Sequence, residues 1–181
     1  MKKILLVFIV ITFAGCLFAQ SYSLVDDSSE VKFSIKNFGL SVSGSFTGLR
    51  GKIIFNPADL PASSISAVVN TSTINTGNEA RDRHLKKEEY FDIGKYPLIS
   101  FVSARISNST KPDVLFMEGK ITIKDITRAI SFPFTVTPRP DGYLYEGTFK
   151  LNRRDFGVGG GSITMSDSLI VSLSIFARKQ N

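Results

Sequence analysis

Apolar and polar side chains alternate along most of the chain, and this period of two constrains the fold more than any other feature. In residues 30–36, Val31, Phe33 and Ile35 alternate with charged or hydroxyl side chains. Successive side chains of a strand point to opposite faces of a sheet, so the run predicts a strand with one apolar face. Similar runs lie at residues 42–46, 53–55, 65–69, 99–103, 115–124, 130–136, 143–151 and 169–177. The pattern predicts an all-β fold of about eight strands.

Turn residues separate these runs. Pro140-Asp141-Gly142 joins two strongly alternating runs and predicts a β-hairpin. Residues 78–91 break the β pattern because they are rich in helix-forming residues, and Asn78 is a suitable N-cap. We therefore expect one short helix beside the strands.

Eight antiparallel strands in one small domain are typical of a sandwich or a closed barrel. Gly44, Gly119 and Gly147 lie inside predicted strands, where glycine marks the bends or bulges that barrel closure needs. A barrel of this size holds either packed side chains or one small ligand. Phenylalanine carries no polar atom, so the 15 phenylalanines suit either a dry core or an apolar ligand.

The N-terminus has the pattern of an export signal. Lys2 and Lys3 precede the uncharged run of residues 4–14, which is shorter than the roughly 20 residues of a membrane span. Cleavage after Ala19 would make residues 1–19 a signal peptide and residues 20–181 one periplasmic or secreted domain. Alternatively, residues 13–16 form a lipobox, and the protein is a lipoprotein anchored through Cys16.

Catalytic, metal-binding and cofactor-binding motifs are not indicated. Cys16 is the only cysteine and His84 the only histidine, too few for a zinc site. A serine nucleophile would need His84 as its base, and the chain has no Gly-x-Ser-x-Gly elbow. The net charge of +6 is scattered, without the basic stripe of a nucleic-acid-binding protein. We expect a protein that is not an enzyme and needs no cofactor.

Four separated motifs resemble the YceI-like family of bacterial lipid-binding proteins. Residues 73–85 read TINTGNEARDRHL, similar to the family's SIxTGNxxRDxHL. Residues 90–101 resemble its FFDxxxYPxIxF, residues 119–128 its GxLTIxGxT, and residues 152–157 its RxDFG. Asp125 departs from the glycine of the third motif. The resemblance spans nearly all of residues 20–181.

The resemblance implies an extended eight-stranded antiparallel barrel, lipocalin-like, with one short helix. It also implies an exported protein that binds a polyisoprenoid or a related long-chain lipid, such as a quinone, along the barrel axis. Transport and storage are both compatible with such a site. The alternation selects the side chains expected to line the cavity: Phe33, Ile35, Phe101, Met117, Phe132, Phe134, Phe149, Val171 and Leu173.

Four basic side chains are candidates for binding a polar headgroup. Arg81 and His84 lie in the predicted helix, and Arg153 and Arg154 follow the strand that ends at Leu151. Arginine suits a phosphate or carbonyl headgroup. For each pair a structural role is the alternative: the first would tie the helix to the barrel, and the second would form a salt-bridged corner.

Other functions remain open on the sequence. A barrel with a dry core would be a structural or stress-related interaction protein. An outer-membrane barrel shares the period of two but commonly ends in an aromatic residue, and this chain ends in Asn181. A hydrolase with a carboxylate pair has no sequence signal here. A homodimer and transient contact with a membrane surface are both compatible with the composition.

Overall fold

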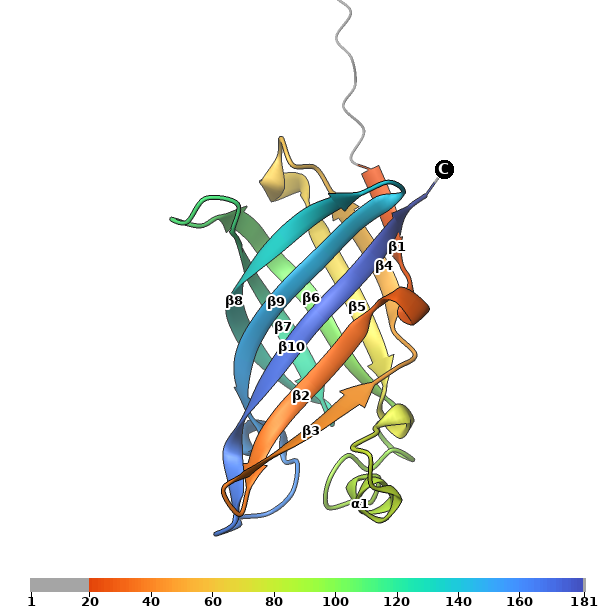
Figure 1. The fold of residues 1–181 in the computed structure, drawn as a ribbon, viewed down its shortest axis with the longest axis vertical. Coiled ribbons are helices and arrows are strands. Elements are labelled where there is room, and N and C mark those ends of the chain that lie inside the picture. The colour runs from red at the N-terminus through yellow and green to blue at the C-terminus, as the bar shows by residue number, and fades with distance from the viewer. Residues whose placement is uncertain (1–19, 181) are drawn as a thin grey trace, which may run out of the picture.

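The computed structural model describes residues 20–180, which form one antiparallel sheet closed into a barrel (Figure 1). Strand β1 (Gln20–Leu24) pairs with both β4 (Arg50–Phe55) and β10 (Met165–Lys179), and so closes the ring. The order around the ring is β1-β4-β5-β6-β7-β8-β9-β10, which confirms the eight-stranded barrel. The other ring strands are β5 (Ser64–Asn70), β6 (Leu98–Asn108), β7 (Leu115–Ile123), β8 (Ile126–Arg139) and β9 (Gly142–Asn152).

Two stretches of extended chain are each divided into two strands by a short interruption. A 3-10 turn, η1 (Asp26–Ser28), separates β1 from β2 (Glu30–Asn37), and residues 47–49 separate β3 (Leu40–Phe46) from β4. The hairpin β2–β3 continues the sheet beside Met165–Ser174 of β10, while β1 pairs with the end of that strand. Beyond β3, within residues 20–180, the sheet continues only as an isolated bridge between Ser45 and Asn75. At the β1 end, hydrogen-bonded strands close the ring of the barrel. At the other end, the segment around Asn75, which is not a strand, lies beside β3.

That segment contains the helix α1 (Glu79–Leu85), shorter than the predicted residues 78–91. The Asn78 side chain caps it by accepting a hydrogen bond from the Arg81 backbone N–H at 3.0 Å. The chain leaves the helix after Leu85 and turns Phe91 toward the core, where its ring centroid lies 5.6 Å from that of Phe46. Packing of Phe91 against the core outweighs the helix propensity of the charged residues before it. The remaining 3-10 turns are η2 (Leu60–Ala62), η3 (Thr71–Thr73) and η4 (Arg153–Phe156).

The interior glycines make room for aromatic rings. A Cβ on Gly44 would come within 2.4 Å of the Phe33 ring, and one on Gly119 within 2.5 Å of the Phe101 ring. Gly119 also lies beside a register shift in β6, as a glycine at a bulge is expected to. The pairing of Gly44 stays regular, so this glycine serves packing and not bending.

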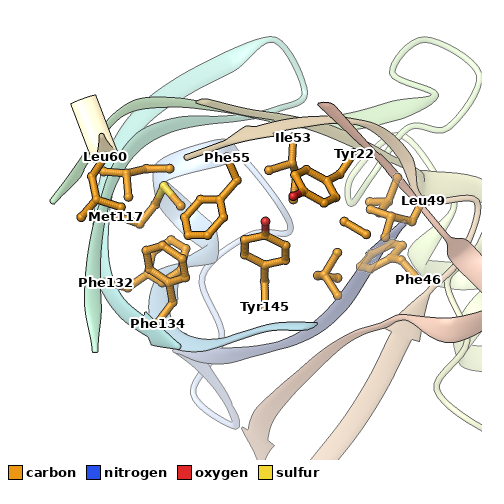
Figure 2. Close-up of a cluster of buried hydrophobic side chains, with 14 of the residues drawn as sticks. Tyr22, Phe46, Leu49, Ile53, Phe55, Leu60, Met117, Phe132, Phe134 and Tyr145 are labelled. Carbon is orange, nitrogen blue, oxygen red and sulfur yellow. The ribbon is translucent and has the colours of Figure 1, made fainter. Parts of the chain in front are cut away.

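Buried side chains fill the barrel at the β1 end. Tyr22, Phe55 and Leu60 pack there with Tyr145 and Met117. Figure 2 shows Tyr22 and Phe55 meeting Tyr145 from the opposite wall. A second buried cluster lies between β7, the end of β9 and η4; it consists of Ile121, Ile123, Leu151, Phe156 and Val158. No helix within residues 20–180 has the length and hydropathy to cross a membrane.

Candidate binding cavity

An apolar cavity of ≈ 270 Å³ runs inside the barrel between these clusters. Its size is just below the range common for ligand pockets, about 300–1,000 Å³. Nearly every barrel strand contributes aliphatic or aromatic side chains to its wall. Tyr22, Phe55 and Leu60 are buried and do not belong to the lining, so they close the cavity at the β1 end. At the other end, Val42, Thr76 and the helix α1 segment border it, and we call this end the mouth.

Several inward-facing side chains keep accessible surface. Phe33, Phe149 and Val171 pack against the core clusters, yet each is only half-buried. Phe132 and Phe134, on the same barrel wall as Phe149, are buried. A densely packed interior leaves no such surface on apolar side chains. The half-buried residues therefore border open space, and the core is not completely filled.

All nine side chains predicted to line a cavity do border this one. The stacked pair Phe132 and Phe149, with centroids 4.6 Å apart, forms part of the wall, and Phe101 lies 6.3 Å from Phe132. The alternation placed them correctly because every second side chain of a barrel strand points inward. That these residues bind a ligand stays a prediction.

Arg81 lies at the mouth. Its Nε donates to Thr76 Oγ1 at 2.7 Å and its Nη2 to the Thr76 carbonyl at 2.8 Å, so it ties α1 to the loop beside β3. The Asp82 carboxylate accepts hydrogen bonds from the backbone N–H and the hydroxyl of the same Thr76. Within residues 20–180 no carboxylate lies within 4.0 Å of the Arg81 guanidinium. The structure thus gives Arg81 a structural role and leaves N–H groups free at the border of an apolar cavity.

His84, the second residue predicted on the helix, does not border the cavity. Its Nε2 lies 3.2 Å from a Glu89 carboxylate oxygen, and its side chain is 49% exposed. The ring packs at 4.9 Å from Tyr90, which does line the cavity. His84 therefore contacts the cavity wall from outside.

The neighbours Arg153 and Arg154 differ sharply. Arg153 is buried, and four of its five N–H groups are bonded: to Asp167 at 2.6 Å and to the carbonyls of Val158, Gly160 and Ser166 at 2.9–3.1 Å. It borders the cavity but serves as the salt-bridged corner that holds residues 157–167. Arg154 is half exposed, 4.0 Å from Asp167, and does not line the cavity.

Five aromatic residues of the wall were not among those predicted from the sequence: Phe46, Tyr90, Phe91, Tyr145 and Phe156. Tyr90 and Phe91 were expected to belong to the helix, whereas both follow it and border the cavity. Tyr145 also lines it, and its position two strand periods before Phe149 was a signal that could have identified it. Burial raises the pKa of Tyr145. Its hydroxyl is buried and has no hydrogen-bond partner within residues 20–180.

The polar groups do not form a metal centre. Within the part of the chain that the structure describes, no three His, Cys, Asp or Glu side chains cluster so that they could hold a metal ion. Cys16 and the two cleavage sites expected around it lie outside the described residues.

Comparison with known proteins places the barrel in a family. The model of the YceI-like domain matches residues 22–177. The chain is 26% identical to Protein YceI of Salmonella agona, over 96% of this chain and 97% of that protein.

Solved structures share the fold. BcnA of Burkholderia cenocepacia superposes with a TM-score of 0.80 at 21% identity, covering 84% of this chain and 98% of BcnA. A polyisoprenoid binding domain from Saccharophagus degradans, implicated in plant cell wall breakdown, superposes with a TM-score of 0.74 at 13% identity. That match covers 89% of this chain and 99% of the domain.

Proposed function

This chain belongs to the YceI-like domain family, and we propose that it binds a polyisoprenoid or similar long-chain amphiphile in the barrel cavity, for transport or storage. The polyisoprenoid binding domain from Saccharophagus degradans shares the fold, which supports this ligand class. The role is that of a binding protein, not of an enzyme.

One observation carries the proposal: the apolar interior of the barrel is not filled by its own side chains. The cavity of ≈ 270 Å³ leaves Phe33, Phe149 and Val171 half-buried. An apolar cavity stays dry and takes up apolar guests. Burial of a hydrocarbon chain there gains about 0.8 kcal/mol per CH₂ group. In the alternative, a structural or interaction protein, the side chains of the barrel would fill its core and these three residues would be completely buried.

The polar groups at the mouth favour an amphiphilic ligand over a pure hydrocarbon. Arg81 has N–H groups free to donate to a phosphate or carbonyl oxygen of a headgroup. An isoprenoid phosphate and a quinone each combine such an oxygen with a long apolar tail. The tail would occupy the cavity as far as Tyr145 and Ile53, which line its closed end.

The protein acts outside the cytoplasm in this proposal, after removal of residues 1–19 or as a lipoprotein anchored through Cys16. The basic start and apolar run of the N-terminus support export. The intact mass of the protein recovered from cells distinguishes the two forms, because they begin at Gln20 and at an acylated Cys16, respectively.

Native mass spectrometry of the protein purified without detergent tests the ligand. We expect a bound long-chain amphiphile that is released by organic solvent. Val171→Phe places a larger side chain in the cavity and should reduce uptake of added prenyl or acyl lipids. Ile170→Phe is the matched control, because Ile170 is the adjacent residue and its side chain is exposed.

Three outcomes would overturn the proposal. An empty protein that takes up no added prenyl or acyl chain has a dry core. Equal uptake by Val171→Phe and the wild type would place the ligand elsewhere. Loss of uptake in Ile170→Phe as well would point to a general effect of the substitutions and not to the cavity.

A further inference from the structure

Three large apolar side chains at the mouth end face solvent. Phe38, Leu40 and Ile163 are 76%, 73% and 105% exposed, more than any other large apolar residue described. The Phe38 N–H donates to the Thr164 carbonyl at 2.9 Å, which joins the β2–β3 turn to the residue after Ile163. Leu40 begins β3 directly after this turn. We call Phe38, Leu40 and Ile163 the apolar tip.

Phe38 has a left-handed backbone conformation, which is unfavourable for phenylalanine. The turn between β2 and β3 has φ 50° at Phe38 and φ 75° at Gly39, a two-residue turn with both central residues in the left-handed region. Such turns favour Asn-Gly, and a bulky residue is strained there. The exposed ring gains little packing in return. A strained residue without compensation inside the molecule points to a role outside it.

The apolar tip adjoins the mouth of the cavity. Asn37 and Met165 are paired across β2 and β10, and both line the cavity. Phe38 follows Asn37 in the chain, and Ile163 precedes Met165 by two residues. The tip is therefore adjacent in the chain to residues that line the cavity, and a hydrocarbon chain leaving the mouth there would meet its apolar side chains.

We propose that the apolar tip inserts into the surface of a phospholipid bilayer and so places the mouth of the cavity at the membrane. Three side chains are far fewer than the 20–30 residues that each partner contributes to a stable protein interface. Reversible insertion into the headgroup region needs only a small apolar surface with nearby positive charge. The exposed side chains of Lys36 and Arg154 supply that charge. A Cβ on Gly161, two residues from Ile163, would lie 3.2 Å from Arg154 Nη1, so this guanidinium lies close to the tip.

The inference rests on the proposed function for its purpose, the exchange of a lipid, but insertion is measured separately. The closed barrel is built entirely from residues 20–179, so the chain beginning at Gln20 carries the whole fold. We would sediment this chain with vesicles of phosphatidylethanolamine and phosphatidylglycerol. The combined variant Phe38→Asn, Leu40→Ser and Ile163→Ser should bind at least about tenfold more weakly. Val102→Ser with Ile170→Ser, at exposed apolar residues away from the tip, should bind like the wild type.

A fluorescent reporter measures the insertion directly. The chain has no tryptophan, so Phe38→Trp introduces a single indole. Its emission should shift to the blue on addition of vesicles, whereas that of Val102→Trp, on the barrel wall, should not.

Several results would overturn the inference: no vesicle binding by the wild type, equal binding by the combined tip variant, or no spectral shift at residue 38. A dimer that the tip substitutions dissociate, without vesicle binding, would show that a second copy covers the tip. If the protein bound vesicles but its cavity took up no lipid, membrane insertion by the tip would stand and only the proposed function would be refuted.

Discussion

The ring of Phe101 occupies the space that a side chain at residue 119 would fill. Gly119 stands there, and a Cβ at this residue would come within 2.5 Å of two carbons of the ring. Phe33 and Gly44 repeat the arrangement on β2 and β3. Both rings also border the cavity. The volume open to a ligand therefore depends on glycines that let these rings pack against the sheet.

Gly119→Ala should destabilise the barrel by about 1–3 kcal/mol, as overpacking of a filled site does. The new methyl group would meet the Phe101 ring and also the Val102 carbonyl oxygen at 2.7 Å, which belongs to the backbone and cannot rotate away. Chemical denaturation measures the loss. Gly94→Ala is the control, because a Cβ there meets no atom within 4 Å. Equal stability of the two variants would contradict the packing role of Gly119.

Arg153→Met should cost about 3 kcal/mol of unfolding free energy. The substitution keeps the apolar stem but leaves three carbonyls and Asp167 without their donor. Arg154→Met should change stability by less than about 0.5 kcal/mol, since its ion pair is long and half exposed. Thermal unfolding of both variants checks the difference, and a large loss in Arg154→Met would refute it.

Phe38→Asn should raise the stability of the protein by about 1 kcal/mol. Asparagine tolerates a positive φ better than phenylalanine does, and the exposed ring contributes little packing. Phe38→Ala keeps a β-carbon in the same backbone conformation, so we expect it to show less of this gain. The melting temperatures of the three proteins test the strain, and a lower value for Phe38→Asn would show that the ring stabilises the fold.

The protein should lose stability above pH 10. Burial, with smaller contributions from Tyr22 and Tyr143, raises the pKa of Tyr145 above its ordinary 10.0, and burial also raises the pKa of Tyr22. The folded state keeps these protons at pH values where the unfolded chain releases them. The free energy of unfolding is thus at its full value below pH 10 and falls as the pH rises further.

Tyr145→Phe should make this alkaline loss shallower, because it removes one of the two buried phenols. At neutral pH the variant should be as stable as the wild type or more so, since the Tyr145 hydroxyl is buried without a partner. Denaturation curves between pH 8 and roughly pH 11 measure both effects. An unchanged pH profile would mean that the pKa of Tyr145 does not differ between the folded and unfolded states, and would contradict the raised pKa.

Much of the candidate site could be predicted from the sequence. Phe132, Phe134 and Met117 were placed in the interior by alternation alone, since every second residue of a strand faces inward. Arg153 and Arg154 could not be told apart in the same way. They are neighbours in a 3-10 turn, and only the fold of residues 157–167 decides which of them is buried.

Local patterns in the sequence determined the strands other than β1, their inward faces, the position of the helix and the family motifs, because each depends on residues close together in the chain. Strand β1, which closes the barrel, lies outside every run that the alternation predicted. Tertiary structure alone decided where the helix ends, since Phe91 packs against Phe46 from a distant strand. It also decided that the barrel keeps a cavity. Whether inward phenylalanines fill a core or border open space depends on the distance between facing walls of the barrel. That distance depends on strands from the whole chain, so no local sequence period predicts it.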